Sequence, residues 1–408
     1  MTSRDRTLTA LNHREPDRVP VDLSGHRSSG IAAMAYARLR DYLGLPKRPI
    51  RVYDPIQQLA VVDEDVLQRF QVDTIELGRA FAQEDRYWAD WVLPDGTPCQ
   101  MPIWARPERD QGDWVFRSKR QVIARMPPRV WYFEQTSFPL MEDENLEHLE
   151  AQFAECMWTA IISPPGPLTA GRNGEEIAKA GAQRLRQQSD RAILGLFGGN
   201  LLELGQFFYR NDNFFMLLAG EPQQAHRFLD KVMEIHLRNL EVFLRTVGPQ
   251  IDVIVFGDDL GMQTGLQISP AMYREFFKPR EQMMWQLVKR RAPHLKIQLH
   301  CCGGVRELLP DLIDAGLDAI NPVQITCDGM EPAGLKRDFG SRLTFWGGGC
   351  DTRKMLSNGT PAQIREHVCR LTDIWRHGGG FVFQQVHNIL GDVPPANVVA
   401  MLDAVHEN

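Results

Sequence analysis

The feature that most constrains the fold is an alternation of short apolar segments with helical stretches, which begins near residue 150. Apolar segments of strand length occur at 191–197, 251–257, 296–301, 319–322, 343–346 and 381–385. Between them, stretches such as 225–247 and 270–291 carry apolar residues at helical spacing. Strands that alternate with helices over so long a stretch form a parallel sheet, because each helix carries the chain back to the start of the next strand.

An eight-stranded barrel is the simplest way to close such a sheet in a chain of 408 residues. The structural alternative is an open, doubly wound sheet. The usual nucleotide-binding signatures of that alternative are absent, since no Gly-x-Gly-x-x-Gly follows the first strand and no Gly-x4-Gly-Lys-Ser/Thr occurs. We therefore predict an α/β fold, a (β/α)8 TIM barrel that occupies residues 1–408 as one domain.

A segment of different character interrupts this pattern at about 84–135. Aromatic and β-branched residues alternate there with turn signals such as Asp95-Gly96, which is typical of antiparallel hairpins. We expect an aromatic-rich β-hairpin insertion in the barrel. Its tryptophans either form the core of the hairpins or line a pocket; they are Trp88, Trp91, Trp104 and Trp114.

Charge and targeting signals exclude several kinds of partner. The net charge is −6 and Lys and Arg form no cluster, so neither nucleic acid nor an anionic membrane surface is expected to bind. The N-terminus lacks the apolar stretch of a secretory signal, and no uninterrupted run of about 20 apolar residues occurs. We expect a cytoplasmic protein, in which the seven cysteines are free thiols or metal ligands and not disulfides.

The strand predicted at 296–301 ends in His300-Cys301-Cys302-Gly303-Gly304. Side chains alternate across a strand, so His300 and Cys302 should point the same way and Cys301 the opposite way. The strand at 343–346 leads through three glycines to Cys350. Imidazole and thiolate suit zinc, and three ligands would leave an open catalytic position. The alternative is that Cys302 and Cys350 are small buried hydrophobic residues, as free cysteines often are.

Two further groups follow strand ends. Asp258 and Asp259 come directly after the strand at 251–257 and could bind substrate, orient a ligand histidine, supply a fourth metal ligand or act in acid–base chemistry. The alternative role is helix capping by aspartate. His387 follows the strand at 381–385 and is predicted to contact substrate, unless it is a structural hydrogen-bonding residue.

These residues together resemble the uroporphyrinogen decarboxylase superfamily. The resemblance is strongest after residue 250 and lies in segments 257–261, 300–304, 311–324, 345–352 and 387–397, with 17–20 near the N-terminus. It implies a single (β/α)8 barrel. The superfamily contains cofactor-free decarboxylases of tetrapyrroles and zinc-dependent methyltransferases that exchange methyl groups with a corrinoid protein.

The resemblance favours the methyltransferase branch. The decarboxylase signature Met-Arg-Gln-Ala-Gly-Arg is missing from the corresponding segment 20–29. His300, Cys302 and Cys350 match the His-x-Cys…Cys metal set of the methyltransferases, which implies zinc bound by these three residues. Asp258, Asp259 and His387 would then position the substrate. Because nothing resembles the corrinoid-binding motif Asp-x-His-x-x-Gly, the cobamide is expected on a separate corrinoid protein.

Two alternatives stay open at the level of sequence. The first is a cofactor-free decarboxylase, in which His26, Arg27 and Asp258 bind or protonate carboxylate-bearing groups. The second is a catalytically idle barrel that binds a corrinoid protein. The tryptophans of the insertion could line a pocket for an aromatic methyl donor, and an upstream glutamate is a further candidate for a fourth metal ligand.

Overall fold

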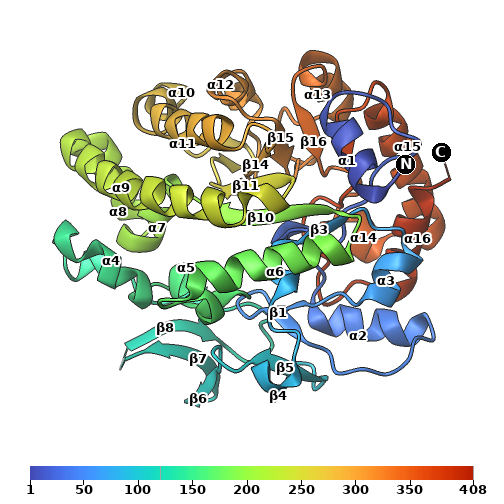
Figure 1. Cartoon of the computed structure of the whole chain (residues 1–408), viewed down its shortest axis with the longest axis horizontal. Coiled ribbons are helices and arrows are strands. Elements are labelled where there is room, and N and C mark those ends of the chain that lie inside the picture. Colours follow the sequence, from blue (N-terminus) through green and yellow to red (C-terminus); the bar gives the residue numbers. More distant parts are fainter. Residues whose placement is uncertain (120, 408) are drawn as a thin grey trace.

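A seven-stranded parallel sheet forms the centre of the molecule (Figure 1). The computed structural model describes residues 1–119 and 121–407. The strands run in the order β17-β16-β15-β14-β11-β10-β3, and every neighbouring pair is parallel. Their bounds are β3 Thr74–Glu76, β10 Ala192–Gly198, β11 Val253–Gly257, β14 Lys296–His300, β15 Ala319–Asn321, β16 Thr344–Trp346 and β17 Phe381–Val382.

The two edges of this sheet meet through the segment around Val21. Val21 forms a parallel bridge with Phe383, just beyond β17. Its carbonyl accepts a 2.8 Å hydrogen bond from the backbone N–H of Asp73, which precedes β3. The eighth position of the barrel is therefore this short bridge, and the predicted TIM-barrel fold is confirmed.

All six strands predicted after residue 150 are present. The sequence also predicts a strand from the apolar run after Pro16, but only Val21 pairs there. β3 was not predicted, because three residues are too few to show a period. Its neighbours fix its conformation: residues 192–194 of β10 pair with it along its whole length.

Helices surround the outside of the sheet (Figure 1). The sequence accounts well for their starts: α15 begins at a capping box in which Thr360 and Gln363 exchange hydrogen bonds, with Pro361 in its first position. The longer helices are α1 Ser3–Leu11, α2 Ala33–Tyr42, α3 Glu64–Arg69, α6 Gly174–Gln188, α7 Leu202–Tyr209, α8 Asn211–Gly220, α9 Pro222–Thr246, α11 Lys278–Arg291, α12 Leu309–Ala315, α13 Pro332–Phe339, α15 Pro361–Arg376 and α16 Pro395–Ala404. Short helical turns are α4 Leu149–Gln152, α5 Met157–Ala160, α10 Pro270–Met272 and α14 Met355–Asn358.

The amino end of the barrel is closed by α1. The Arg4 N–H bonds to the Asp190 carbonyl ahead of β10, and the Gly380 N–H bonds to the Ala10 carbonyl ahead of β17. Leu11 packs into the barrel interior with Leu194, Val253, Val255, Ala319, Trp346 and Val382. With the amino end plugged, the carboxyl ends of the strands are left for a site, as in other barrels of this kind.

The predicted β-hairpin insertion is present and lies apart from the central strands (Figure 1). It comprises β4 Trp88–Val92, β5 Pro98–Pro102, β6 Glu108–Asp110, β7 Asp113–Ser118, β8 Gln121–Met126 and β9 Glu134–Gln135. Trp91 and Trp114 pack edge to face at 5.2 Å, so these rings belong to the core of the hairpins. Because the insertion leaves the barrel after β3 and returns at α6, it starts from the carboxyl end of the sheet.

Three antiparallel pairs stand beside the main sheet. They are the hairpin β4–β5, the pair β1 Val52–Asp54 with β2 Leu59–Ala60, and the pair β12 Gly261–Met262 with β13 Gly265–Leu266. Across residues 1–119 and 121–407, no helix has both the length and the apolar character needed to cross a membrane.

Candidate active site

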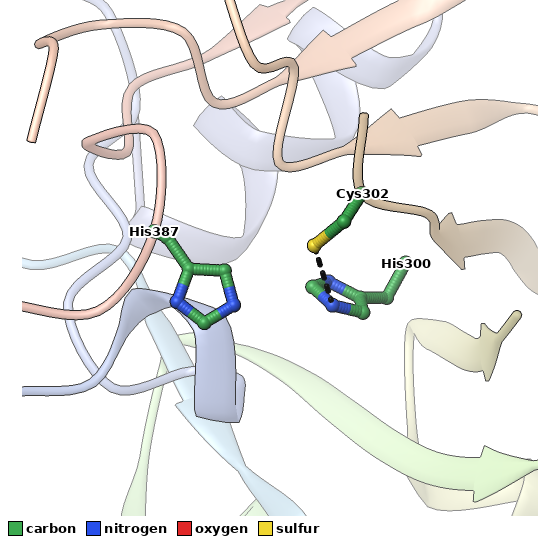
Figure 2. A group of neighbouring side chains, drawn as sticks. All are labelled: His300, Cys302 and His387. Carbon is green, nitrogen blue, oxygen red and sulfur yellow. Dashed lines mark hydrogen bonds between the residues drawn. The ribbon is translucent and has the colours of Figure 1, made fainter. Parts of the chain in front are cut away.

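His300, Cys302 and His387 form a group of possible metal ligands at the carboxyl end of the barrel (Figure 2). One ligand atom from each residue lies within 4.8 Å of the others. His300 ends β14, and Cys302 follows two positions later on the same side. His387 comes from the loop after β17. Two strand ends that are distant in the sequence therefore converge at one end of the barrel, as its topology requires.

The spacing of this group fits a tetrahedral metal ion. Cys302 Sγ lies 3.6 Å from His300 Nε2, the contact drawn dashed in Figure 2. Zinc binds sulfur at about 2.3 Å and imidazole nitrogen at about 2.0–2.1 Å, which places two tetrahedral ligands roughly 3.5–3.6 Å apart. The donor set of two imidazoles and one thiol also suits the borderline softness of zinc.

The ring of His300 is held in an orientation suited to a ligand. Its Nδ1 lies 2.8 Å from Asn321 Oδ1, which can only accept, so the proton belongs on Nδ1 and the Nε2 lone pair faces Cys302. Asn321 pairs in register with His300 across β14 and β15. Its amide nitrogen donates to the Trp346 carbonyl and to Gln384 Oε1, which fixes the amide orientation. Such outer partners are typical of metal-binding histidines.

The surroundings of Cys302 favour a thiol unless a cation is nearby. Burial, followed by the charge of Asp259, raises the pKa of the Cys302 thiol well above its ordinary value. The Cys302 N–H donates to Asp259 Oδ1 at 2.7 Å, and the same oxygen lies 3.9 Å from His300 Nε2. A bound metal ion reverses this preference, because a coordinating thiol is deprotonated. Asp259 therefore lies beside His300 and Cys302 and orients the Cys302 backbone.

Asp258 is buried and caps the start of α7. Its two carboxylate oxygens accept the backbone N–H groups of Leu201, Leu202 and Glu203 at 2.8–3.2 Å. Burial raises the pKa of Asp258 to about 7, although these three bonds act in the opposite direction. Asp258 therefore caps a helix, which was the alternative role considered for it. The helix that it caps, α7, comes before Asp258 in the chain and not after it.

Glu203 is a further carboxylate beside the site. The sequence suggested an upstream glutamate as a possible ligand but did not identify which one. Burial, and then the charges of Asp259 and Asp258, raise its pKa well above the ordinary value. Its Oε2 accepts a 2.7 Å hydrogen bond from Asn200. The available signal was its position just after the Gly198-Gly199 end of β10, one strand away from Asp258.

Cys350 lies outside the ligand group. It is fully buried in the main hydrophobic core, and its Sγ contacts the carbonyl of its neighbour Asp351 at 3.8 Å. The Asp351 backbone bonds to His367 on α15, which draws the loop toward that helix. Burial raises the pKa of the Cys350 thiol. The group of possible ligands thus contains His387, predicted to contact substrate, and does not contain Cys350.

A third imidazole, His26, borders the site. Its ring centroid lies 5.2 Å from that of His300, while the His300 and His387 rings are 5.8 Å apart. The neighbouring Arg27 points toward other groups: its Nε lies 3.1 Å from Asp54, and its Nη2 donates to Ser163 Oγ. Of the residues proposed for a decarboxylase, His26 thus contacts the ring of His300, whereas Arg27 pairs with Asp54 and Ser163.

Residues 203–408 match the family model described as Uroporphyrinogen decarboxylase (URO-D). The uroporphyrinogen decarboxylase of Legionella pneumophila is 26% identical over 191 residues, which cover 47% of this chain and 50% of that protein. That of Psychromonas ingrahamii is 30% identical over 192 residues, covering 46% and 49%. The chain thus matches these curated relatives over about half of their length.

The fold is shared with a solved structure described as a methyltransferase from Methanosarcina mazei. The TM-score is 0.58 at 17% sequence identity, and the alignment covers all of this chain and 99% of the other. The family match extends over half of the chain and includes the strands that carry His300, Cys302 and His387. On this evidence the chain belongs to the uroporphyrinogen decarboxylase (URO-D) family.

Proposed function

We propose that this protein is a zinc-dependent methyltransferase or demethylase that moves a methyl group between a small molecule and a separate corrinoid protein. Zinc would be held by His300, Cys302 and His387. The observation that carries the proposal is the 3.6 Å approach of Cys302 Sγ to His300 Nε2 inside a three-residue group at the carboxyl end of the barrel.

The chemistry of the donor set supports catalysis over a purely structural role. Structural zinc sites in proteins usually have four protein ligands, whereas catalytic sites keep a position open for substrate. Zinc bound here would act as a Lewis acid toward the heteroatom that carries the methyl group. Neighbouring residues hold two of the proposed ligands in place: Asn321 orients His300, and Asp259 fixes the backbone of Cys302.

The small molecule is expected to exchange its methyl group with a cobamide that is bound to a separate corrinoid protein. The sequence supports this because it lacks a corrinoid-binding motif of the Asp-x-His-x-x-Gly type. The likeness to the methyltransferase from Methanosarcina mazei supports the fold on which the proposal depends.

Metal analysis of purified protein tests the proposal. Protein prepared in reducing buffer without chelator should contain about one zinc per chain, because three ligands of this kind bind one ion. Cys302→Ser should lose most of it. Cys369→Ser, in the partly exposed part of α15, is the matched control and should keep it. Wild-type protein without zinc would contradict the proposal.

Cys350→Ser separates the two possible ligand sets. If His387 is the third ligand, Cys350→Ser keeps its zinc and His387→Ala loses it. If the set implied by the sequence resemblance is correct, the results are reversed.

A cofactor-free decarboxylase is the alternative, supported by the names of the curated relatives. It predicts release of CO2 from a carboxylated substrate with full activity in chelator. The structure offers Asp258 little freedom for such a role, because both of its oxygens are already occupied by the start of α7.

A further inference from the structure

The hairpin insertion contacts the barrel through an aromatic segment, Trp131-Tyr132-Phe133, which lies between β8 and β9. Phe133 belongs to the core of the insertion, where its ring lies 4.6 Å from that of Phe116. Trp131 packs against the main core instead. The two outer rings of the aromatic segment are therefore held in different cores, and Tyr132 lies at the junction between them.

The aromatic segment lies against the loop that follows β17. A Cβ on Gly391 would lie 3.3 Å from Trp131 Cε3, so the indole ring packs directly on the backbone of that loop. The Tyr132 hydroxyl donates to Asn388 Oδ1 at 3.2 Å. Asn388 Nδ2 donates to Gln57 Oε1 at 2.7 Å, which fixes the orientation of the amide. Asn388 is buried, so solvent does not compete for these bonds.

Asn388 connects the insertion to His387. Its side chain forms hydrogen bonds with the ring of His387 and with Tyr132. The backbone of the loop is fixed on both sides of this pair, because the N–H groups of Val386 and Ile389 bond to carbonyls of other segments at 2.9 and 2.8 Å. These bonds hold the main chain but not the imidazole. The hydrogen bond with Asn388 is what orients the ring.

The two histidines of the ligand group are thus supported in the same way. His300 Nδ1 lies 2.8 Å from Asn321 Oδ1, and the ring of His387 bonds to Asn388. Each asparagine is held by further hydrogen bonds, Asn321 inside the barrel and Asn388 by the insertion. Outer partners of this kind fix the ring of a ligand histidine and strengthen metal binding.

We propose that the insertion holds His387 in the site and that Tyr132 is the positioning residue through which it does so. Tyr132 acts on Asn388, and Asn388 acts on the ring. The inference rests on the proposed function for the role of His387 as a metal ligand. Tyr132 lies outside residues 203–408, which match the family model, so the contact gives the insertion a role of its own at the site.

Three substitutions test this connection. Tyr132→Phe removes the hydroxyl that donates to Asn388 and keeps the aromatic ring. Asn388→Ala removes the group through which Tyr132 acts. Tyr42→Phe, the same change at a tyrosine of α2 that is 57% exposed, is the matched control. If Tyr132 acts through Asn388, Tyr132→Phe has no further effect in protein that already carries Asn388→Ala.

Zinc affinity, measured by competition with a chromogenic chelator, is the first readout. We expect Tyr132→Phe to weaken zinc binding about 3- to 10-fold, because one neutral hydrogen bond is lost. Asn388→Ala should weaken it about 10- to 100-fold. The double variant should match Asn388→Ala, and Tyr42→Phe should match the wild type. Losses that add up in the double variant would mean that Tyr132 does not act through Asn388, and would overturn the inference.

Nitrogen NMR of zinc-free protein labelled in its histidines is the second readout. The ring signals of His387, assigned by their loss in His387→Ala, should move in Tyr132→Phe and stay in place in Tyr42→Phe. Unmoved signals in folded Tyr132→Phe would overturn the inference and leave the zinc proposal intact. Moved signals without any change in zinc affinity would support the positioning role of Tyr132 and would overturn the proposed function of His387 as a ligand.

Discussion

At the scale of single residues, strand alternation carried most of the information. It predicted that His300 and Cys302 share one side and that Cys301 takes the other, and Cys301 is indeed buried in the main core with its Sγ accepting the Leu260 N–H. The choice between Cys350 and His387 was beyond such reasoning. Both follow strand ends, and only the paths of the two loops decide which side chain reaches the site.

Asn321 gives a residue-scale prediction. Asn321→Leu removes the acceptor that orients His300, so zinc affinity should fall about 10- to 100-fold. Competition with a chromogenic chelator measures this. Asn145→Ala, at an exposed turn just before α4, is the control and should bind zinc as the wild type does. Equal affinity in Asn321→Leu would mean that the ring of His300 needs no such support.

Glu76 gives a prediction about pH. Burial raises its pKa to about 7 from an ordinary value of 4.5. The folded chain therefore holds the proton of Glu76 more tightly than the unfolded chain does. The contribution of Glu76 to stability is greatest below pH 4.5 and falls as the pH rises to about 7. Glu76→Gln removes the effect and should stabilise the protein above pH 7 by at most about 3 kcal/mol. Urea unfolding at pH 5 and pH 8 measures the difference, and a gain that is the same at both would contradict this account.

At the scale of elements, the sequence identified those that are long enough to show a period or bounded by clear caps. The six later strands, α9 and α11 are of this kind. β3 was missed because it has three residues, and the strand expected after Pro16 is reduced to a bridge at Val21. The start of α7 was equally hidden, since its cap comes from Asp258, more than 50 residues later.

That cap can be tested by unfolding. Asp258→Ala leaves three backbone N–H groups at the start of α7 without acceptors, which should cost roughly 2–4 kcal/mol of stability. Asp258→Asn keeps one oxygen acceptor and should cost less. Denaturant unfolding gives both values. If Asp258→Ala were as stable as the wild type, the aspartate would be free for chemistry, and the decarboxylase alternative would gain support.

At the scale of the whole molecule, the alternation of strands and helices was sufficient to predict a barrel, and the barrel to predict where a site lies. α1 plugs the amino end, and the hairpin insertion departs from the carboxyl end. What could not be predicted is how the loops at that end bring together residues 26, 259, 300, 302, 321 and 387. Their convergence depends on hydrogen bonds between segments hundreds of residues apart, such as Ser28 to Asn321.

The central claim is that zinc is held here by one thiolate and two imidazoles. X-ray absorption at the zinc edge of the purified, metal-loaded protein tests it most directly, because it counts sulfur and nitrogen neighbours separately. We predict one sulfur at about 2.3 Å and at least two nitrogen atoms at about 2.0–2.1 Å. Two sulfur neighbours would place Cys350 in the site in place of His387, and a zinc ion without any sulfur neighbour would contradict the account altogether.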